Sequence, residues 1–377
     1  MLPRQWGRVE RLLVLGAGAG QLGLLAAARA RGLFVIAVDR DPAAPGFRYA
    51  DRRAIVSVED EPALERLAEA ERVDGVIAPG ADWPVGPAAR IAARLGLPHP
   101  ISPETAVLST SKLRQHERLS EAGVPQTGWK VLSAPDEAIG LPALVRPPDR
   151  QGRRARSLVR SPRELRDAVR AALRASRIGL CLVEEVVPEP VVTVSGFAHE
   201  GALYALVVCD RLPLATVWES EHARAAAVVA SRAAHALGIA AGPAVVQLRI
   251  ASDGPRVLEA SARLGGGHDA ELCKAALGVD LNTLALSAAL GEPVDARRLR
   301  PRRPKGGACV RFLDGVGDAH GVEAAGAVRG VEWARVYGGS DRAGAVLATG
   351  ATPARALEQA TRAAECIRFS APHARTA

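Results

Sequence analysis

The chain has 377 residues, of which 48% are hydrophobic, 24% charged and only 3% aromatic. This composition excludes a mainly disordered chain, and the length predicts two or three domains. The formal net charge of +8 comes from 49 Lys and Arg residues spread along the chain. Because aromatic rings for base stacking are scarce, we expect no specific nucleic-acid partner.

Cysteine usage and hydropathy predict a soluble, cytoplasmic protein. The five cysteines are an odd number, lie far apart and form no C-x-x-C pair, which is typical of reduced thiols. No apolar run has the length of a membrane span, so we expect no membrane partner. The cysteines are Cys181, Cys209, Cys273, Cys309 and Cys366.

The first hundred residues predict a doubly wound α/β domain. Short continuous apolar runs, typical of buried parallel strands, alternate with amphipathic helical patterns. Such alternation is typical of a parallel sheet with helices on both faces. The expected strands are 11–15, 33–38 and 74–78, and the expected helices are 21–31, 61–70 and 84–95.

A glycine motif joins the first strand to the first helix. Residues Gly18 to Gly23 satisfy G-x-G-x-x-G, and Asp39 ends the second strand about 20 residues further on, as in the dinucleotide fingerprint. This pattern supports one hypothesis, an NAD-dependent oxidoreductase with Asp39 on the ribose. Asp82 and Trp83 follow the third strand, where ligands collect in parallel sheets, although a simple turn explains them equally well.

The rest of the chain predicts mixed α+β regions. Residues 102–125 read as two short helices, and an alanine-rich helix runs from about His222 to Leu237. A basic, proline-rich linker precedes a small C-terminal region. Further expected elements are a strand ending at Arg146, a helix at 162–175, strands at 181–187, 191–197 and 202–212, and a closing helix near 353–367.

Residues 242–269 predict a hairpin with one polar face. If Ser252, Asp253 and Gly254 form a three-residue loop, Arg249 pairs with Val257 and Gln247 pairs with Glu259. Acid, amide and hydroxyl groups are hard oxygen ligands, which suit Mg²⁺, while a guanidinium group suits phosphate. A hairpin that simply faces water remains an alternative. The expected polar face is Gln247, Arg249, Glu259, Ser261 and Arg263, and the apolar face is Val246, Leu248, Ile250, Leu258 and Ala260.

The stretch VLEASARLGGGHDAELCKAALGVDL (257–281) resembles the signature of the ATP-grasp superfamily. It is similar to the branch of the carbamoyl-phosphate synthase large chain, the formate-dependent phosphoribosylglycinamide formyltransferase and the amino-acid ligases. This resemblance implies that Gln247 and Glu259 hold Mg²⁺ (or Mn²⁺) beside ATP and that Arg263 contacts the transferred phosphoryl group. The family's second metal-binding Asn is Ser261 here. The glycine bend faces the acceptor substrate in the family, and His268 after it is a catalytic candidate that would steer an anionic intermediate or accept a proton, with a structural role in the turn as the alternative.

The resemblance also implies an ATP site made of dispersed residues. Lys112 and Arg146 would contact the phosphates. The loop that covers them is glycine-rich in the family and arginine-rich here, so either guanidinium groups replace the backbone contacts or the loop closes less tightly on ATP. The end of the strand that begins at Cys181 would border the adenine. The acid that binds the ribose in the family is missing at the expected spacing, and Glu189 is the nearest carboxylate. The residues concerned are Arg153 and Arg154 in the loop, Glu184, Glu185, Val186 and Val187 at the adenine, and Glu189 near the ribose.

The predicted function is an ATP- and Mg²⁺-dependent ligase that joins a carboxylate to an amine, a thiol or another nucleophile through an acyl phosphate. Its partners would be small carboxylates and amines, and a homodimer is compatible with the sequence. Three alternatives stay open: a non-catalytic ATP-grasp protein, the NAD-dependent oxidoreductase and a bicarbonate-using carboxylase. The expected α/β fold comprises a Rossmann-like pre-ATP-grasp domain (1–105), two α+β ATP-grasp subdomains (106–187 and 188–295) and a small α+β C-terminal domain (296–377).

Overall fold

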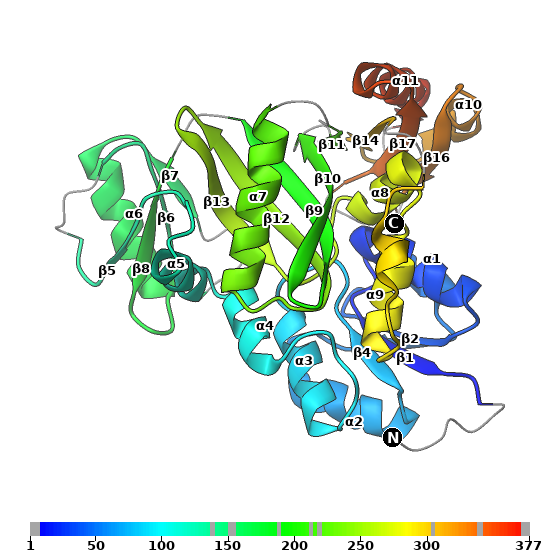
Figure 1. Ribbon diagram of the computed structural model, residues 1–377, viewed down its shortest axis with the longest axis horizontal. Helices are drawn as coiled ribbons and strands as arrows, with labels where there is room; N and C mark the ends of the chain where they lie inside the picture. Colours follow the sequence, from blue (N-terminus) through cyan, green and yellow to red (C-terminus); the bar gives the residue numbers. More distant parts are fainter. Residues whose placement is uncertain are drawn as a thin grey trace, which may run out of the picture.

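The computed structural model describes residues 8–135, 140–149, 156–186, 190–210, 214–216, 221–302, 306–337 and 342–370. These residues form four four-stranded sheets and one two-stranded ribbon (Figure 1). The predicted α/β class, with a parallel N-terminal sheet followed by antiparallel sheets, is confirmed. None of the described helices combines the length and the apolar character that a bilayer span requires.

The N-terminal sheet is parallel, with strand order β3-β2-β1-β4. Strands β1 and β2 are buried because their residues are apolar on both faces. The sequence interpretation missed β3, since its RRAI run is largely exposed and carries no apolar signal. The elements are β1 (Arg11–Leu15), α1 (Leu22–Ala30), β2 (Phe34–Asp39), β3 (Arg52–Ile55), α2 (Glu61–Glu71), β4 (Gly75–Ile77) and α3 (Val85–Arg94).

Two short helices lead to an antiparallel sheet with strand order β5-β8-β6-β7. Helix α6 covers one face of this sheet with Leu165, Val169 and Ala172, which recur at helical spacing. Ser161 caps α6 by accepting a hydrogen bond from the N–H of Glu164. The elements are α4 (Pro103–Thr110), α5 (Lys112–Glu121), β5 (Trp129–Leu132), β6 (Ala143–Arg146), β7 (Ser157–Val159), α6 (Pro162–Ala175) and β8 (Cys181–Glu185).

A second antiparallel sheet, with strand order β10-β9-β12-β13, carries α7 across one face (Figure 1). Buried alanines of α7 share a core with Val194, Val246 and Leu248 of the sheet. Small alanine side chains allow the helix to approach the strands closely. The elements are β9 (Val191–His199), β10 (Ala202–Asp210), α7 (Glu221–Ala236), β12 (Gly242–Ala251), β13 (Gly254–Ser261), α8 (Asp269–Leu277) and α9 (Leu281–Ala289).

The loop of the β12–β13 hairpin differs from the prediction. Ala251 pairs with Gly254, so the loop has two residues (252–253) instead of three. A β-bulge adds one residue to β13 between the Leu248–Val257 pair and the Gln247–Glu259 pair. The two differences cancel, and Gln247 lies opposite Glu259 as predicted.

Between the loop and the bulge the predicted register was wrong by one residue. Arg249 pairs with Arg256 instead of Val257. As a consequence, Val257 packs in the core in place of Leu258, because a one-residue shift exchanges the two faces of a strand.

The C-terminal sheet has strand order β11-β14-β17-β16. Its strand β11 comes from the range assigned to the second ATP-grasp subdomain, yet it pairs with β14. The remaining elements are β11 (Leu214–Ala215), β14 (Gly307–Leu313), β15 (Ala319–His320), α10 (Val322–Gly326), β16 (Val331–Val336), β17 (Gly344–Gly350), α11 (Pro353–Cys366) and β18 (Arg368–Phe369), with β15 paired to β18.

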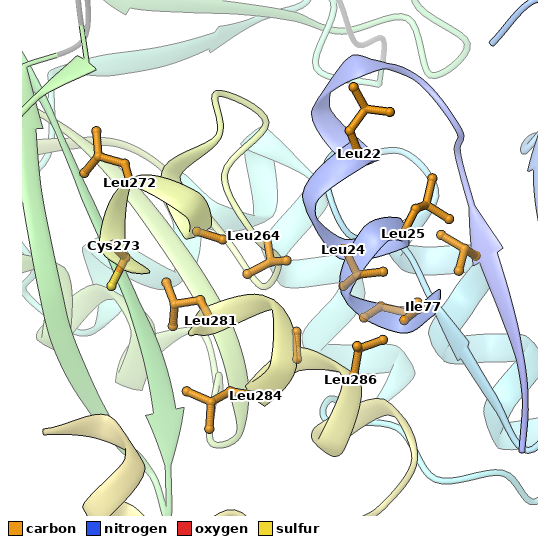
Figure 2. Close-up of a cluster of buried hydrophobic side chains, with 14 of the residues drawn as sticks. Leu22, Leu24, Leu25, Ile77, Leu264, Leu272, Cys273, Leu281, Leu284 and Leu286 are labelled. Carbon is orange, nitrogen blue, oxygen red and sulfur yellow. The ribbon is translucent and has the colours of Figure 1, made fainter. Parts of the chain in front are cut away.

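One hydrophobic core joins the N-terminal domain to α8 and α9. Figure 2 shows Leu22 and Leu25 of α1 in the same cluster as Leu272 of α8 and Leu284 of α9. Each fully buried leucine contributes about 1.5–3 kcal/mol to folding. The same core extends to Leu347 of the C-terminal sheet. The predicted domains at 1–105, 188–295 and 296–377 therefore all contribute residues to one shared core.

Candidate active site

Lys112 and Glu259 form an ion pair at the centre of the candidate site. Lys112 begins α5, where the side chain of Ser111 caps the helix by accepting a hydrogen bond from the N–H of Arg114. The Lys112 Nζ lies 2.5 Å from Glu259 Oε2, and the two side chains are 14% and 25% exposed. Burial lowers the pKa of Lys112, while the charge of Glu259 opposes that shift. The ion pair therefore connects α5 to the β12–β13 hairpin. In Figure 1, α5 lies between the β5-β8-β6-β7 sheet and the β10-β9-β12-β13 sheet.

Gln247 and Glu259 present an amide and a carboxylate from neighbouring strands. They are direct partners across the hairpin, and both side chains are half-buried. Opposed residues of an antiparallel pair have Cβ atoms about 4.5–5.5 Å apart, so both can reach one ligand. Among the residues that the structure describes, no three His, Cys, Asp or Glu side chains form a metal-binding group.

Arg146 and Glu184 form a second ion pair, which includes a histidine that the sequence interpretation missed. The Arg146 Nη2 and the His116 Nε2 lie 2.6 and 3.0 Å from Glu184 Oε1. Burial acts to raise the pKa of Glu184, but the His116 hydrogen bond and the Arg146 charge outweigh it and hold that pKa below its ordinary value. The buried Nε of Arg146 has no hydrogen-bond partner within the described chain.

His116 could have been found from its spacing. It follows Lys112 by four residues on α5, which places both side chains on one face of the helix. The His116 Nδ1 lies 2.6 Å from Gln126 Oε1, and its ring stacks on Trp129 with centroids 5.2 Å apart. Both ring nitrogens therefore have oxygen partners within the chain, which fixes the orientation of the ring beside Glu184.

Asp82 connects the N-terminal sheet to the end of the hairpin. Its Oδ1 accepts hydrogen bonds from Ser261 Oγ and Arg263 Nε, each at 2.7 Å. Burial acts to raise the pKa of Asp82, but the charge and hydrogen bond of Arg263 lower it to about 2. Arg263 also donates to the Leu264 carbonyl oxygen at 2.8 Å, so its guanidinium group is held at two points.

The geometry does not favour Ser261 as a metal ligand. Its side chain is 2% exposed, and its hydroxyl donates to Asp82 instead of turning toward Glu259. The register places Ser261 opposite Val245, so no second oxygen ligand faces it across the hairpin. Ser261 therefore acts in this geometry as a support for Asp82.

His268 lies in a buried cluster, which argues against the predicted proton-transfer role. Its Nδ1 lies 2.5 Å from Glu271 Oε2, and its Nε2 lies 2.5 Å from Tyr337 Oη. The side chain is 4% exposed and packs edge-on against Trp333. Because both ring nitrogens have partners, the arrangement favours His268 as an anchor for the preceding glycine bend.

The predicted adenine wall is described only in part. The N–H groups of Glu185 and Val186 donate to the carbonyl oxygens of Gly128 and Pro142 at 2.7 and 3.3 Å. These two donors are therefore used within the chain, and the Glu185 side chain is exposed. Arg153, Arg154, Val187 and Glu189 lie outside the described residues, and their contacts with ATP stay predictions.

The G-x-G-x-x-G turn is closed by the protein's own backbone. A Cβ atom at Gly20 would lie 3.0 Å from the carbonyl oxygen of Gly266, and one at Gly80 would lie 2.9 Å from that of Gly20. In dinucleotide-binding proteins the second glycine of the motif lets a pyrophosphate approach. Asp39, predicted to bind ribose, accepts a hydrogen bond from the Ala17 N–H at 2.9 Å. Both observations argue against the dinucleotide interpretation.

Comparison with known proteins finds relatives that align with most of the chain. No family model matches the chain. It is 29% identical over 391 aligned residues to the formate-dependent phosphoribosylglycinamide formyltransferase of Burkholderia pseudomallei, covering 95% of each protein. It is also 27% identical over 269 residues to the uncharacterized protein y4rH of Sinorhizobium fredii, covering 66% of this chain and 56% of that protein.

Solved structures share the fold over almost the whole chain. The L-amino acid ligase from Bacillus licheniformis superposes with a TM-score of 0.78 at 19% identity, covering 97% of this chain and 100% of that one. The biotin carboxylase domain of the Hydrogenobacter thermophilus 2-oxoglutarate carboxylase, solved with MgADP, ADP and bicarbonate, gives 0.75 at 16% identity, covering 96% and 90%. At such identities the likeness establishes the fold.

Proposed function

We propose that this chain, which has the fold of the ATP-grasp ligases, is an ATP- and Mg²⁺-dependent enzyme that joins a small carboxylate to an amine. The observation that carries the proposal is the Lys112–Glu259 pair opposite Gln247. Catalysis of phosphoryl transfer consists mainly of positioning and charge stabilisation. A site made of cations and oxygen ligands from separate elements suits that task.

The residues present fit a divalent cation and a polyphosphate. Gln247 and Glu259 are the residues that would hold Mg²⁺, which when bound neutralises the phosphate oxygens of ATP. The Nε of Arg146, which has no hydrogen-bond partner among the described residues, and the buried ammonium of Lys112 would meet the phosphates. Both cations are already held by carboxylates, so little reorganisation is needed when the nucleotide arrives.

Arg263 would act on the transferred group. In the proposed reaction the substrate carboxylate attacks the γ-phosphorus of ATP, the bond to the bridging oxygen breaks and ADP leaves. The amine then attacks the acyl carbon, loses a proton, and phosphate departs. A guanidinium fixed by Asp82 and by the Leu264 carbonyl oxygen is preorganised to stabilise the charge on that phosphate throughout.

The names of two relatives support an amine as the acceptor substrate. The formyltransferase and the L-amino acid ligase are named for reactions in which an acyl group meets an amine. An amino acid as one substrate is the choice that the name of the L-amino acid ligase supports.

The test measures ADP release from MgATP in the presence of amino-acid pairs, of formate or other small carboxylates with amines, and of bicarbonate. We expect release that needs both a carboxylate and an amine and that is lost in Glu259→Ala. ADP release with bicarbonate in place of the carboxylate would identify the protein as a carboxylase instead of a ligase. No release with any combination, together with unimpaired MgADP binding, would identify a non-catalytic nucleotide-binding protein.

A further inference from the structure

A cavity of about 410 Å³ lies outside the candidate active site, between α1, α8 and the β16 strand of the C-terminal sheet. Figure 2 shows how α1 faces α8 and α9 across the core that borders this region. The volume lies within the range of small-molecule sites. Its floor is formed by small side chains of the two helices: Ala26, Ala27, Ala30 and Ala275.

The third glycine of the G-x-G-x-x-G motif helps to form this cavity. A Cβ atom at Gly23 would lie 2.9 Å from the Glu271 Cδ and 3.0 Å from the Asn282 Nδ2. Gly23, Glu271 and Asn282 all line the cavity. The motif, which serves no dinucleotide in this geometry, therefore has a role in shaping this wall.

The cavity wall carries two cations whose hydrogen-bonding capacity is only partly used. Arg335 donates through Nη1 to Glu271 Oε1 at 2.6 Å, and its guanidinium lies 4.1 Å from the centroid of the Trp333 ring. Lys274 Nζ lies 2.7 Å from Asp280 Oδ2, and the Lys274 side chain is 62% exposed. A guanidinium has five N–H donors and an ammonium has three, so both retain donors for a carboxylate.

Glu332 is an acid on the same wall that forms no ion pair with the described residues. Glu332 is exposed and accepts a hydrogen bond from Thr349 Oγ1 at 3.3 Å. In the described part of the chain no Lys, Arg or His forms an ion pair with it. An ammonium group is the ligand function that complements this carboxylate.

We propose that this cavity binds a small zwitterion, a free α-amino acid or a dipeptide, at a site separate from the reaction centre. The ligand carboxylate meets Arg335 and Lys274, its ammonium meets Glu332, and its side chain lies on the alanine floor. Glu271 accepts a hydrogen bond from Arg335 and also pairs with His268, so Arg335 and Glu271 connect the ligand to the histidine that follows the glycine bend. This gives the site a physical connection to the reaction centre.

The test titrates the nucleotide-free protein with each of the twenty common L-amino acids and with glycylglycine, by calorimetry and saturation-transfer NMR. We expect at least one of these ligands to bind and its N-acetylated form to fail. Ala26→Phe fills the cavity, and Glu332→Gln removes the ammonium partner without disturbing a buried group. Each change should weaken binding at least tenfold.

Lys112→Gln, in the candidate active site, is the matched control and should leave this affinity unchanged. Binding that survives both cavity variants but is lost in Lys112→Gln would place the ligand in the reaction centre and overturn the proposal. Absence of binding by every amino acid and by glycylglycine would overturn it as well.

Discussion

The glycine turn after β1 and the charged site around α5 differ in how completely their polar groups are satisfied. The turn matches the G-x-G-x-x-G pattern, yet Gly20 lies against Gly266 and Asp39 accepts a hydrogen bond from the Ala17 N–H. The charged site is made of dispersed residues, yet it buries a lysine and leaves the Arg146 Nε without a partner in the described chain. Unsatisfied charge, more than motif match, therefore distinguishes a binding site from a structural turn.

The largest expected effect comes from Glu259→Ala. Loss of the carboxylate removes the proposed metal ligand and the partner of Lys112, so ADP formation should fall about 10²–10³-fold. Glu200→Ala, at an exposed turn residue, is the control and should keep full turnover. Steady-state ADP release with matched thermal melts measures both, and wild-type turnover in Glu259→Ala would refute the assignment.

A smaller loss is expected for nucleotide affinity in Lys112→Gln. Removing a buried cation from a charge pair costs about 2–5 kcal/mol, which corresponds to at least about a 30-fold rise in the Kd for MgADP. Titration calorimetry checks this value. An unchanged Kd would show that the nucleotide does not bind at the Lys112–Glu259 pair.

Acid should weaken the link between Asp82 and Arg263. The pKa of Asp82 is lowered from its ordinary value of 3.8 to about 2, so its stabilising contribution is complete above pH 4 and is lost as the pH falls toward 2. The shift corresponds to about 2 kcal/mol. In urea unfolding, Asp82→Asn should be less stable than wild type at pH 7, and the difference should shrink at pH 3. A difference that grows in acid would contradict this account.

The smallest expected effect is a loss of folding stability when a side chain is added beside the glycine turn that follows β1. In Gly80→Ala the new Cβ would lie 2.9 Å from the carbonyl oxygen of Gly20, and such overpacking costs about 1 kcal/mol or more. Gly326→Ala, where a Cβ atom would have no heavy atom within 4 Å, is the matched control. Urea midpoints compare the two, and equal stability would mean that the turn has room for a ligand.

Helices could be predicted well because their signals are local. Ser161 and Pro162 begin α6, and the predicted range 162–175 matches its observed bounds. The exposed edge strand β3 has no comparable signal, since its pairing with β2 depends on distant sequence. The same limitation applies to β11, which pairs with β14 far along the chain.

The candidate site could be predicted only in part. The Gln247–Glu259 pairing was correct because a shorter loop and a bulge offset each other, and neither was visible in the sequence. Asp82 lies 179 residues before Ser261, and only the folded chain brings them together. The buried surroundings of His268 could not be predicted, because its partner Tyr337 follows a strand of a separate sheet.

The most direct test of the central claim compares MgADP with NAD⁺ in thermal melts of the wild type and of Lys112→Gln. At 100 times the Kd, a ligand stabilises the folded state by about 2.7 kcal/mol. We predict that MgADP raises the wild-type Tm, that the same MgADP concentration has a much smaller effect on Lys112→Gln, and that NAD⁺ changes neither. A rise with NAD⁺ and none with MgADP would contradict the account.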